Sequence, residues 1–161
     1  DPKLQTTIFN GFELRAAVTP YTGGGYMHAT DDRTPVTFIT RYYLDKIKRL
    51  CDAHGTKLLF VTAPSPVNHT MQRHNEVQAL ADALAVPYLD LNLNTEELGI
   101  DWNLDTLDGG DHLNYTGCQK ATAYLQRYMQ THYTLPDRRK DARYETWNKR
   151  AAEFEKLLPQ T

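Results

Sequence analysis

The residues best suited to chemistry lie in the run from Asp105 to Asn114, which holds Asp108, Asp111 and His112. A carboxylate next to a histidine can fix the imidazole tautomer and stabilise the imidazolium that forms during proton transfer. Two glycines inside the run allow the backbone to turn sharply. The same residues also fit an acidic turn in which the histidine only caps or packs. Residue types and spacing leave both interpretations open.

Two short apolar runs predict the strands that would position this site. Residues 57–62 and 87–91 are nearly continuous in apolar side chains, which is typical of parallel strands buried on both faces. A helix predicted over 71–85 separates them, and this spacing indicates a βαβ unit. In open α/β sheets, ligands gather beyond the carboxyl ends of the strands. We expect the loops 63–70 and 92–115 there, and the second loop carries the acidic run.

Apolar residues at helical spacing predict three further helices, over 37–54, 116–132 and 144–158. In the first of them, the apolar residues between Ile39 and Leu50 form one face that would pack inward. The region before these elements is less regular. There the sequence predicts a hairpin and a glycine-rich loop.

The hairpin is predicted where Thr6–Phe9 and Phe12–Val18 flank Asn10-Gly11, a strong turn signal. The three glycines at 23–25 suggest a phosphate-binding loop. That interpretation fails, because no Lys-Ser/Thr pair follows and no strand-to-helix context surrounds them.

Composition limits the class of protein. The chain has 161 residues, 40% of them hydrophobic and 24% charged, which fits one ordinary globular domain and excludes a disordered, collagen-like or coiled-coil chain. The formal net charge of −2 provides no global basic field, so we expect no nucleic-acid partner. No apolar run approaches the roughly 20 residues of a membrane span.

Neither the cysteines nor the histidines show the spacing of a metal site, so we expect no metal and no cofactor. Cys51 and Cys118 each lie on the apolar face of a predicted helix, which indicates buried free thiols. His69 and His74 are five residues apart, not the four of a helical zinc pair. His69 falls in the loop after the first strand, where it could line the cleft, and we expect it at the surface.

One stretch resembles a known family. Residues 108–117, continuing into a helix with Lys120, resemble the last block of SGNH (GDSL-type) hydrolases, of the form Asp-x-x-His-(Leu/Pro)-(Asn/Ser)-x-x-Gly. Residues 57–66 and 87–92 are similar to the closing βαβ unit of that family, and the tail 134–147 is similar to its bacterial members. The resemblance covers about residues 35–150.

The resemblance implies a three-layer α/β/α, flavodoxin-like sheet, of which this chain holds the C-terminal βαβα part. We expect a single domain, 1–161. Its parts would be an irregular or hairpin segment over 1–35, a βαβ core with its C-terminal helix over 36–132, and a connector with a terminal helix over 133–161.

The resemblance also implies roles for individual residues. His112 would be the general base that activates a serine. Asp108 would orient it, with Asp111 as the alternative, because the family places its acid three residues before the histidine and this chain has Gly109 there. The remaining candidates would lie on the substrate side: Ser65, Asn68 and Asn114.

The nucleophile departs from the family. The family's serine lies in a Gly-Asp-Ser-like turn near its N-terminus, and this sequence has no such block; its only serine is Ser65, after a later strand. We therefore expect the C-terminal part of a longer esterase or acyltransferase, with the serine upstream. The substrate would be an acylated cell-surface carbohydrate or lipid, and the location extracytoplasmic or at the cell surface. The alternatives are a non-catalytic binding or scaffolding domain, and an unorthodox pair of Ser65 with His112.

Overall fold

The computed structural model describes residues 12–158. Contacts between residues divide the chain into two compact units, 16–124 and 1–15 with 125–161. The first is called the larger unit and the second the smaller unit, and each is described by itself. The prediction of one domain in three parts stays a prediction.

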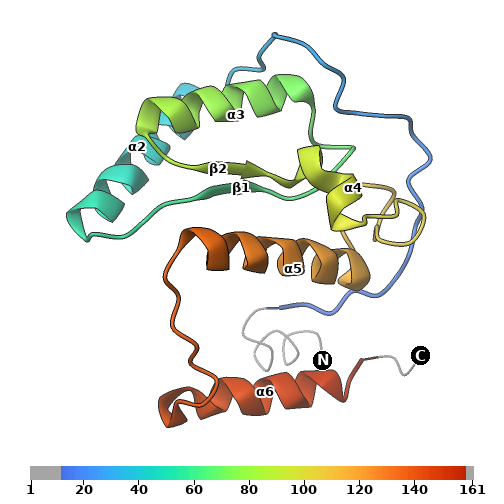
Figure 1. The fold of residues 1–161 in the computed structure, drawn as a ribbon. Coiled ribbons are helices and arrows are strands. Elements are labelled where there is room, and N and C mark those ends of the chain that lie inside the picture. Colours follow the sequence, from blue (N-terminus) through green and yellow to red (C-terminus); the bar gives the residue numbers. More distant parts are fainter. Residues whose placement is uncertain (1–11, 159–161) are drawn as a thin grey trace. The chain divides into compact units, whose positions relative to one another are not determined.

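The larger unit contains the βαβ motif that the sequence predicts. Strands β1 (Phe60–Thr62) and β2 (Tyr88–Asp90) pair in parallel, in a register that sets Thr62 opposite Asp90. Helix α3 (Met71–Leu84) connects them, as Figure 1 shows. The chain is therefore a mixed α/β protein with a two-stranded parallel sheet. Both strands are shorter than their apolar runs.

The expected burial of the first strand on both faces is wrong. Val61 is 41% exposed. Side chains alternate between the two faces of a sheet, so Val61 points away from the face of Phe60 and Thr62, and the described part of the chain leaves that second face partly uncovered. The core of the larger unit lies instead around α3 and the end of β2. Its buried apolar residues are Leu80, Ala81, Val86, Leu89, Leu91 and Leu98.

Helix α2 (Phe38–Ala53) confirms the helix predicted over 37–54. It begins at Thr37, whose side chain accepts a hydrogen bond from the Thr40 amide, 3.2 Å away, as expected of an N-cap threonine. Its apolar face is not buried, contrary to expectation: no residue of α2 is buried, and Phe38 is 80% exposed. An amphipathic pattern fixes which face is apolar, but nothing in residues 12–158 covers this one.

Helix α3 is bounded by two local signals. Thr70 is its N-cap and accepts from the Arg73 amide. Ala85 ends it in the left-handed conformation, with φ of 50°. The chain after β2 was expected to be a loop, yet it holds a 3-10 turn (η1, Leu91–Asn94) and the short helix α4 (Thr95–Leu98).

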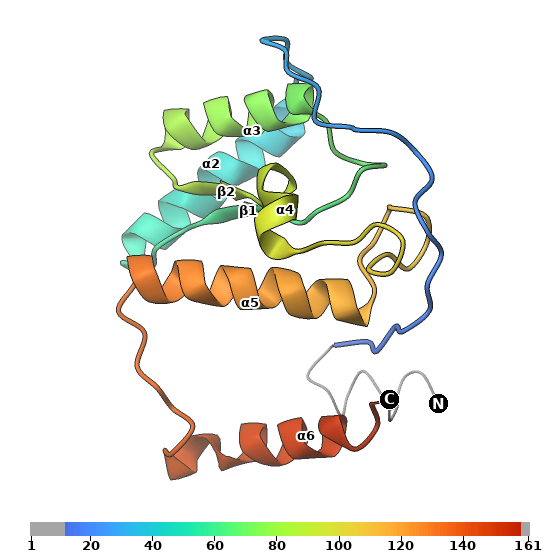
Figure 2. The same cartoon turned by 45° about the vertical axis from the view of Figure 1, so that its right-hand side comes forward.

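Helix α5 (Tyr115–His132) confirms the helix predicted over 116–132; it begins in the larger unit and ends in the smaller one. Its N-terminus depends on Asn114, whose side-chain oxygen accepts from the Gly117 amide at 3.1 Å. Gly117 is buried because the backbone of Asp105 passes close by: a Cβ atom there would lie 2.4 Å from the Asp105 carbonyl oxygen. Figure 2 shows the N-terminal end of α5 beside the loop that precedes it.

The smaller unit holds the turn η2 (Ala142–Tyr144) and helix α6 (Glu145–Glu155). Helix α6 lies within the helix predicted over 144–158. Of the predicted hairpin, Thr6–Phe9 and Asn10-Gly11 lie outside the described residues, and Phe12–Val18 has no regular secondary structure. Phe12 packs edge-on against Phe154, with ring centroids 5.5 Å apart.

Two further sequence expectations concern exposure. Cys51 and Cys118 are free thiols as predicted, but they are half-buried rather than buried. Among the described residues, no helix combines the length and the apolar character needed to cross a bilayer.

Candidate functional site

His112 and Asp108 form the central contact of the candidate site. The His112 Nδ1 atom lies 2.7 Å from Asp108 Oδ2, and the His112 backbone N–H donates to Asp108 Oδ1, also at 2.7 Å. One carboxylate therefore holds both the ring and the main chain of the same histidine. The His112 side chain is 66% exposed, so solvent reaches the imidazole.

Asp111, the other candidate acid, does not make this contact. Its Oδ2 lies 3.7 Å from His112 Nδ1, beyond hydrogen-bond distance. Its Oδ1 instead accepts a hydrogen bond from the Asn68 side-chain amide. Of the two acids that the sequence nominates, Asp108 is the one positioned to orient the imidazole, and Asn68 contacts Asp111 rather than an open site.

The turn that carries His112 requires its two glycines. Gly109 has φ of 73° and Gly110 φ of 97°, which are left-handed values that other residues adopt at a cost. A Cβ atom on Gly110 would also lie 2.8 Å from both Pro66 and Tyr21. The Gly110 amide donates to Thr106 Oγ1 at 2.7 Å, so this buried threonine stabilises the turn.

Ser65 braces the same turn. Its hydroxyl donates toward the carbonyl oxygens of Asp111 at 2.9 Å and Gly110 at 3.2 Å. Its backbone N–H donates to the Asn92 side chain at 2.8 Å. Within the described residues no hydrogen bond joins Ser65 to the His112 ring. The unorthodox Ser65–His112 pair therefore has no direct hydrogen bond here and stays a prediction.

Asn114 has a structural role in place of the expected contact with substrate. It is only 2% exposed. Its oxygen caps α5, and its amide nitrogen donates to the Leu104 carbonyl at 2.7 Å and to the Ala17 carbonyl at 3.3 Å. All of its polar atoms are used in holding the fold.

Below the turn lies the ion pair of Asp105 with Lys120. The Asp105 carboxylate is buried and also accepts from the Asp101 amide at 2.7 Å. Burial alone would raise the pKa of Asp105, but the hydrogen bonds from Lys120 and the Asp101 backbone hold that pKa below its usual value. The pair ties the loop that carries His112 to the first turns of α5.

A second polar cluster surrounds Asp90 at the carboxyl end of β2. His69 Nε2 and His74 Nδ1 each lie 2.8 Å from Asp90 Oδ2, and the Tyr88 hydroxyl donates to the same oxygen at 3.1 Å. Asp90 Oδ1 accepts from the backbone and side chain of Asn92, at 2.9 and 2.8 Å. The expectation of a surface position for His69 is wrong, because the residue is buried against this carboxylate.

The charge on Asp90 follows from these contacts. Burial alone would raise its pKa, but the hydrogen bonds from His69 and Asn92 outweigh that effect and hold the pKa well below its usual value. Burial raises the pKa of the Tyr88 phenol, with the Asp90 carboxylate adding to the effect. Asp90 is therefore a carboxylate and Tyr88 a neutral donor near neutral pH. Sequence reasoning missed this cluster, although its position where a strand ends is a recognised signal.

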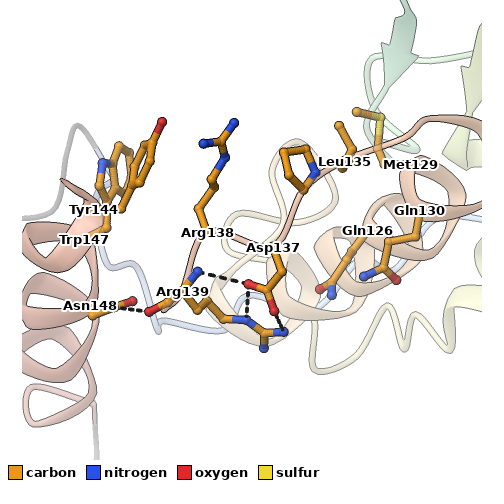
Figure 3. A pocket seen from close by; sticks show the side chains of 11 residues that line it. Gln126, Met129, Gln130, Leu135, Asp137, Arg138, Arg139, Tyr144, Trp147 and Asn148 are labelled. Carbon is orange, nitrogen blue, oxygen red and sulfur yellow. Dashed lines mark hydrogen bonds and ion pairs between the residues drawn. The ribbon is translucent and has the colours of Figure 1, made fainter. Parts of the chain in front are cut away.

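The smaller unit contains a cavity of about 710 Å³ (Figure 3). Arg138 lies over the Tyr144 ring, 5.4 Å from its centroid, and Asp137 pairs with Arg139 at 2.6 Å along the wall. The other lining residues are Gln126, Met129, Gln130, Leu135, Pro136, Trp147 and Asn148. None of them is a residue that the sequence nominates for function.

Comparison of the chain with family models, with curated proteins and with solved structures finds no match. A carboxylate that accepts from His112 Nδ1 fixes the imidazole tautomer, as the orienting acid of a general base does, whereas the Ser65 hydroxyl is directed at main-chain carbonyl oxygens.

Proposed function

We propose that the chain is the base-bearing part of a serine ester hydrolase or acyltransferase of the SGNH type. The observation that carries the proposal is the 2.7 Å contact between His112 Nδ1 and Asp108 Oδ2. It is supported by the resemblance of residues 108–117 to the family's last block and by the parallel βαβ unit. The flavodoxin-like three-layer sheet and a cell-surface location belong to the same proposal.

The contact explains how His112 would act. A carboxylate accepts a hydrogen bond only from a ring nitrogen that carries a proton, so Asp108 favours the tautomer with the proton on Nδ1. The Nε2 atom then carries the lone pair. It takes the proton of a serine hydroxyl as the oxygen attacks an ester carbonyl, and Asp108 stabilises the imidazolium that results.

The rest of the cycle follows from proton balance. The imidazolium returns its proton to the leaving alkoxide, which departs as an alcohol and leaves an acyl-serine. Water attacks the acyl-serine in hydrolysis, and the hydroxyl of an acceptor attacks it in acyl transfer. His112 again takes the proton of the attacking oxygen and returns it to the serine. We assign the substrate to O-acylated cell-surface carbohydrates or lipids.

The nucleophile in this proposal is a serine outside the 161 residues. Ser65 is the sole serine of the sequence, and its hydroxyl is directed at the Asp111 and Gly110 carbonyl oxygens. The exposed Val61 on β1 and the exposed apolar face of α2 favour a sheet that continues with further strands. Such strands would bring the serine to His112.

The second candidate function is a non-catalytic binding or scaffolding domain. It is favoured by the hydrogen bond from Ser65 to the Asp111 carbonyl oxygen. A fold that has lost its catalytic serine would still keep Ser65 as a brace of this turn. The two candidates differ in one respect only: whether a serine reaches His112 in the polypeptide that the gene encodes.

The test is labelling with a fluorophosphonate, read by intact mass and peptide mapping. We expect no label on the 161-residue chain, and stoichiometric label on one serine of the gene's full product. His112→Ala should abolish that label, while His54→Ala, an exposed histidine at the end of α2, should leave it unchanged. Label on Ser65 would overturn the assignment of the nucleophile. A full gene product that takes no label would favour the non-catalytic domain.

A further inference from the structure

The Asp90 carboxylate gathers two imidazoles at one oxygen atom. His69 comes from the loop after β1, His74 from the first turns of α3, and Asp90 from the end of β2. Both ring nitrogens lie 2.8 Å from Asp90 Oδ2. The three side chains are 7%, 15% and 1% exposed, respectively. Two imidazoles and a carboxylate thus converge inside the larger unit.

We propose that His69 Nε2, His74 Nδ1 and Asp90 Oδ2 bind a zinc ion. Imidazole nitrogen and carboxylate oxygen are established zinc ligands, at about 2.0–2.2 Å from the metal. The three atoms lie within 4.8 Å of one another. Ligands on a tetrahedral ion stand about 3.4 Å apart at those bond lengths. Each imidazole nitrogen would therefore withdraw from Asp90 Oδ2 by about 0.6 Å, the difference between 3.4 Å and its present 2.8 Å contact.

Zinc binding here requires a change of tautomer and no net loss of protons from neutral rings. Without the metal, His69 Nε2 and His74 Nδ1 carry the protons that they donate to Asp90. The metal needs the lone pairs of those atoms. Each ring therefore moves its proton to its other nitrogen, while Asp90 remains a carboxylate throughout.

The groups around Asp90 suit a metal ligand. Asn92 holds Asp90 Oδ1 with two hydrogen bonds, and Tyr88 donates to Oδ2 at 3.1 Å. Ligating carboxylates are usually oriented by such partners. Three protein ligands leave the fourth tetrahedral position to water, as in catalytic rather than structural zinc sites. The partial exposure of His74 gives the ion a path to the site.

A rival cluster exists at the exposed turn. Ligand atoms of Asp108, Asp111 and His112 also lie within 4.8 Å of one another. Their carboxylates are about two-fifths exposed, and Asn68 already engages Asp111. The buried cluster offers two imidazoles where this one offers one, and nitrogen ligands favour zinc. The test must nevertheless separate the two positions.

The first measurement is calorimetric titration of the untagged, metal-stripped 161-residue chain with Zn²⁺. We expect one equivalent to bind. His74→Gln and Asp90→Asn should each weaken binding by at least about 100-fold, whereas Asn92→Ala, which acts through Asp90, should cost roughly 10-fold. Two matched histidine controls, His132→Gln and His112→Gln, should leave zinc affinity unchanged.

A second measurement needs no substitution, so it stands even if Asp90→Asn does not fold. In imidazole ¹⁵N spectra of the wild-type chain, Zn²⁺ should shift His69 and His74 together, while the other four rings keep their positions. No binding at one equivalent would overturn the proposal and leave the cluster as a hydrogen-bonded hub. Zinc that shifts His112, or that is lost in His112→Gln, would overturn it in favour of the exposed turn. Neither result depends on whether His112 is a catalytic base.

Discussion

The Ser65 hydroxyl donates a hydrogen bond to the main-chain oxygen of Asp111, 2.9 Å away, and so links the loop after β1 to the turn that carries His112. The two residues are 46 positions apart in the sequence. In an SGNH-type hydrolase, the hydroxyl of the nucleophilic serine would face the imidazole. Here it faces the backbone of the residue before that imidazole, which is the geometry of a brace rather than of a nucleophile.

Replacing Ser65 by alanine should therefore lower stability and leave the His112–Asp108 contact in place. We expect a loss of about 1 kcal/mol in the free energy of unfolding, the usual value of one intramolecular hydrogen bond. Urea denaturation would measure it. Thr56→Ala, which removes an exposed hydroxyl after α2, is the matched control and should change stability by less than half as much. Equal effects of the two substitutions would contradict the bracing role.

Close packing between α5 and the preceding loop makes a second prediction. A Cβ atom on Gly117 would lie 2.4 Å from the Asp105 carbonyl oxygen, and the Asp105 backbone is held by two hydrogen bonds, to the Asp101 carbonyl and from the Asn114 amide. Gly117→Ala should destabilise the larger unit by roughly 1–3 kcal/mol, as overpacking typically does. Gly24→Ala is the control, because a Cβ atom there meets nothing within 4 Å. Comparable thermal midpoints for the two variants would show that the helix can move away from the loop.

The close packing at Gly117 illustrates what the sequence could and could not predict. The βαβ unit and the boundaries of α2, α3 and α5 follow from local periodicity and capping residues, and the structure confirms them. The approach of Gly117 to Asp105 is a relation between a helix and a loop, so no local pattern specifies it.

The contacts around Asp90 could not be predicted from the sequence for the same reason. His69 lies 21 residues before Asp90 in the sequence, and a single histidine in a loop carries no sign of its distant partner. The burial of the α2 face was mispredicted for a related reason. Amphipathic spacing identifies the apolar side of a helix such as that of Phe38 and Leu50, but not whether other elements cover it.

The ion pair of Asp105 with Lys120 predicts a pH dependence of stability. The pKa of Asp105 is lower in the folded chain than in the unfolded one, so the unfolded chain binds its proton first as the pH falls. The stabilisation is thus present above the unfolded value, about 3.9, and is lost as the pH drops through the folded value. Urea denaturation between pH 7 and pH 2 should show this loss.

Asp105→Asn should remove that part of the profile. At pH 7 the variant should be less stable by about 1.5–3 kcal/mol, the range for a hydrogen bond to a charged group, and it should lose less stability than wild type on acidification. Asp137→Asn is the matched control. Hydrogen bonds from Arg139 lower the pKa of Asp137 to about 2, but this pair is fully exposed in solvent, so its removal should leave the acid profile nearly unchanged.

The difference between Asp108 and Asp111 makes the last prediction. Asp108 lies 2.7 Å from His112 Nδ1 and Asp111 lies 3.7 Å from it, so only Asp108 should fix the tautomer. In imidazole ¹⁵N spectra of the 161-residue chain, His112 should carry its proton on Nδ1. Asp108→Asn should move the population toward the Nε2-protonated form, because an amide can donate to Nδ1 where a carboxylate cannot. Asp111→Asn should leave it unchanged.

In the gene's full product, Asp108→Asn should lower kcat by about 10⁴-fold, as loss of the orienting acid does in serine proteases. Equal effects of the two substitutions on the tautomer would mean that the turn orients His112 through its backbone, and that neither carboxylate acts as the acid of a catalytic triad.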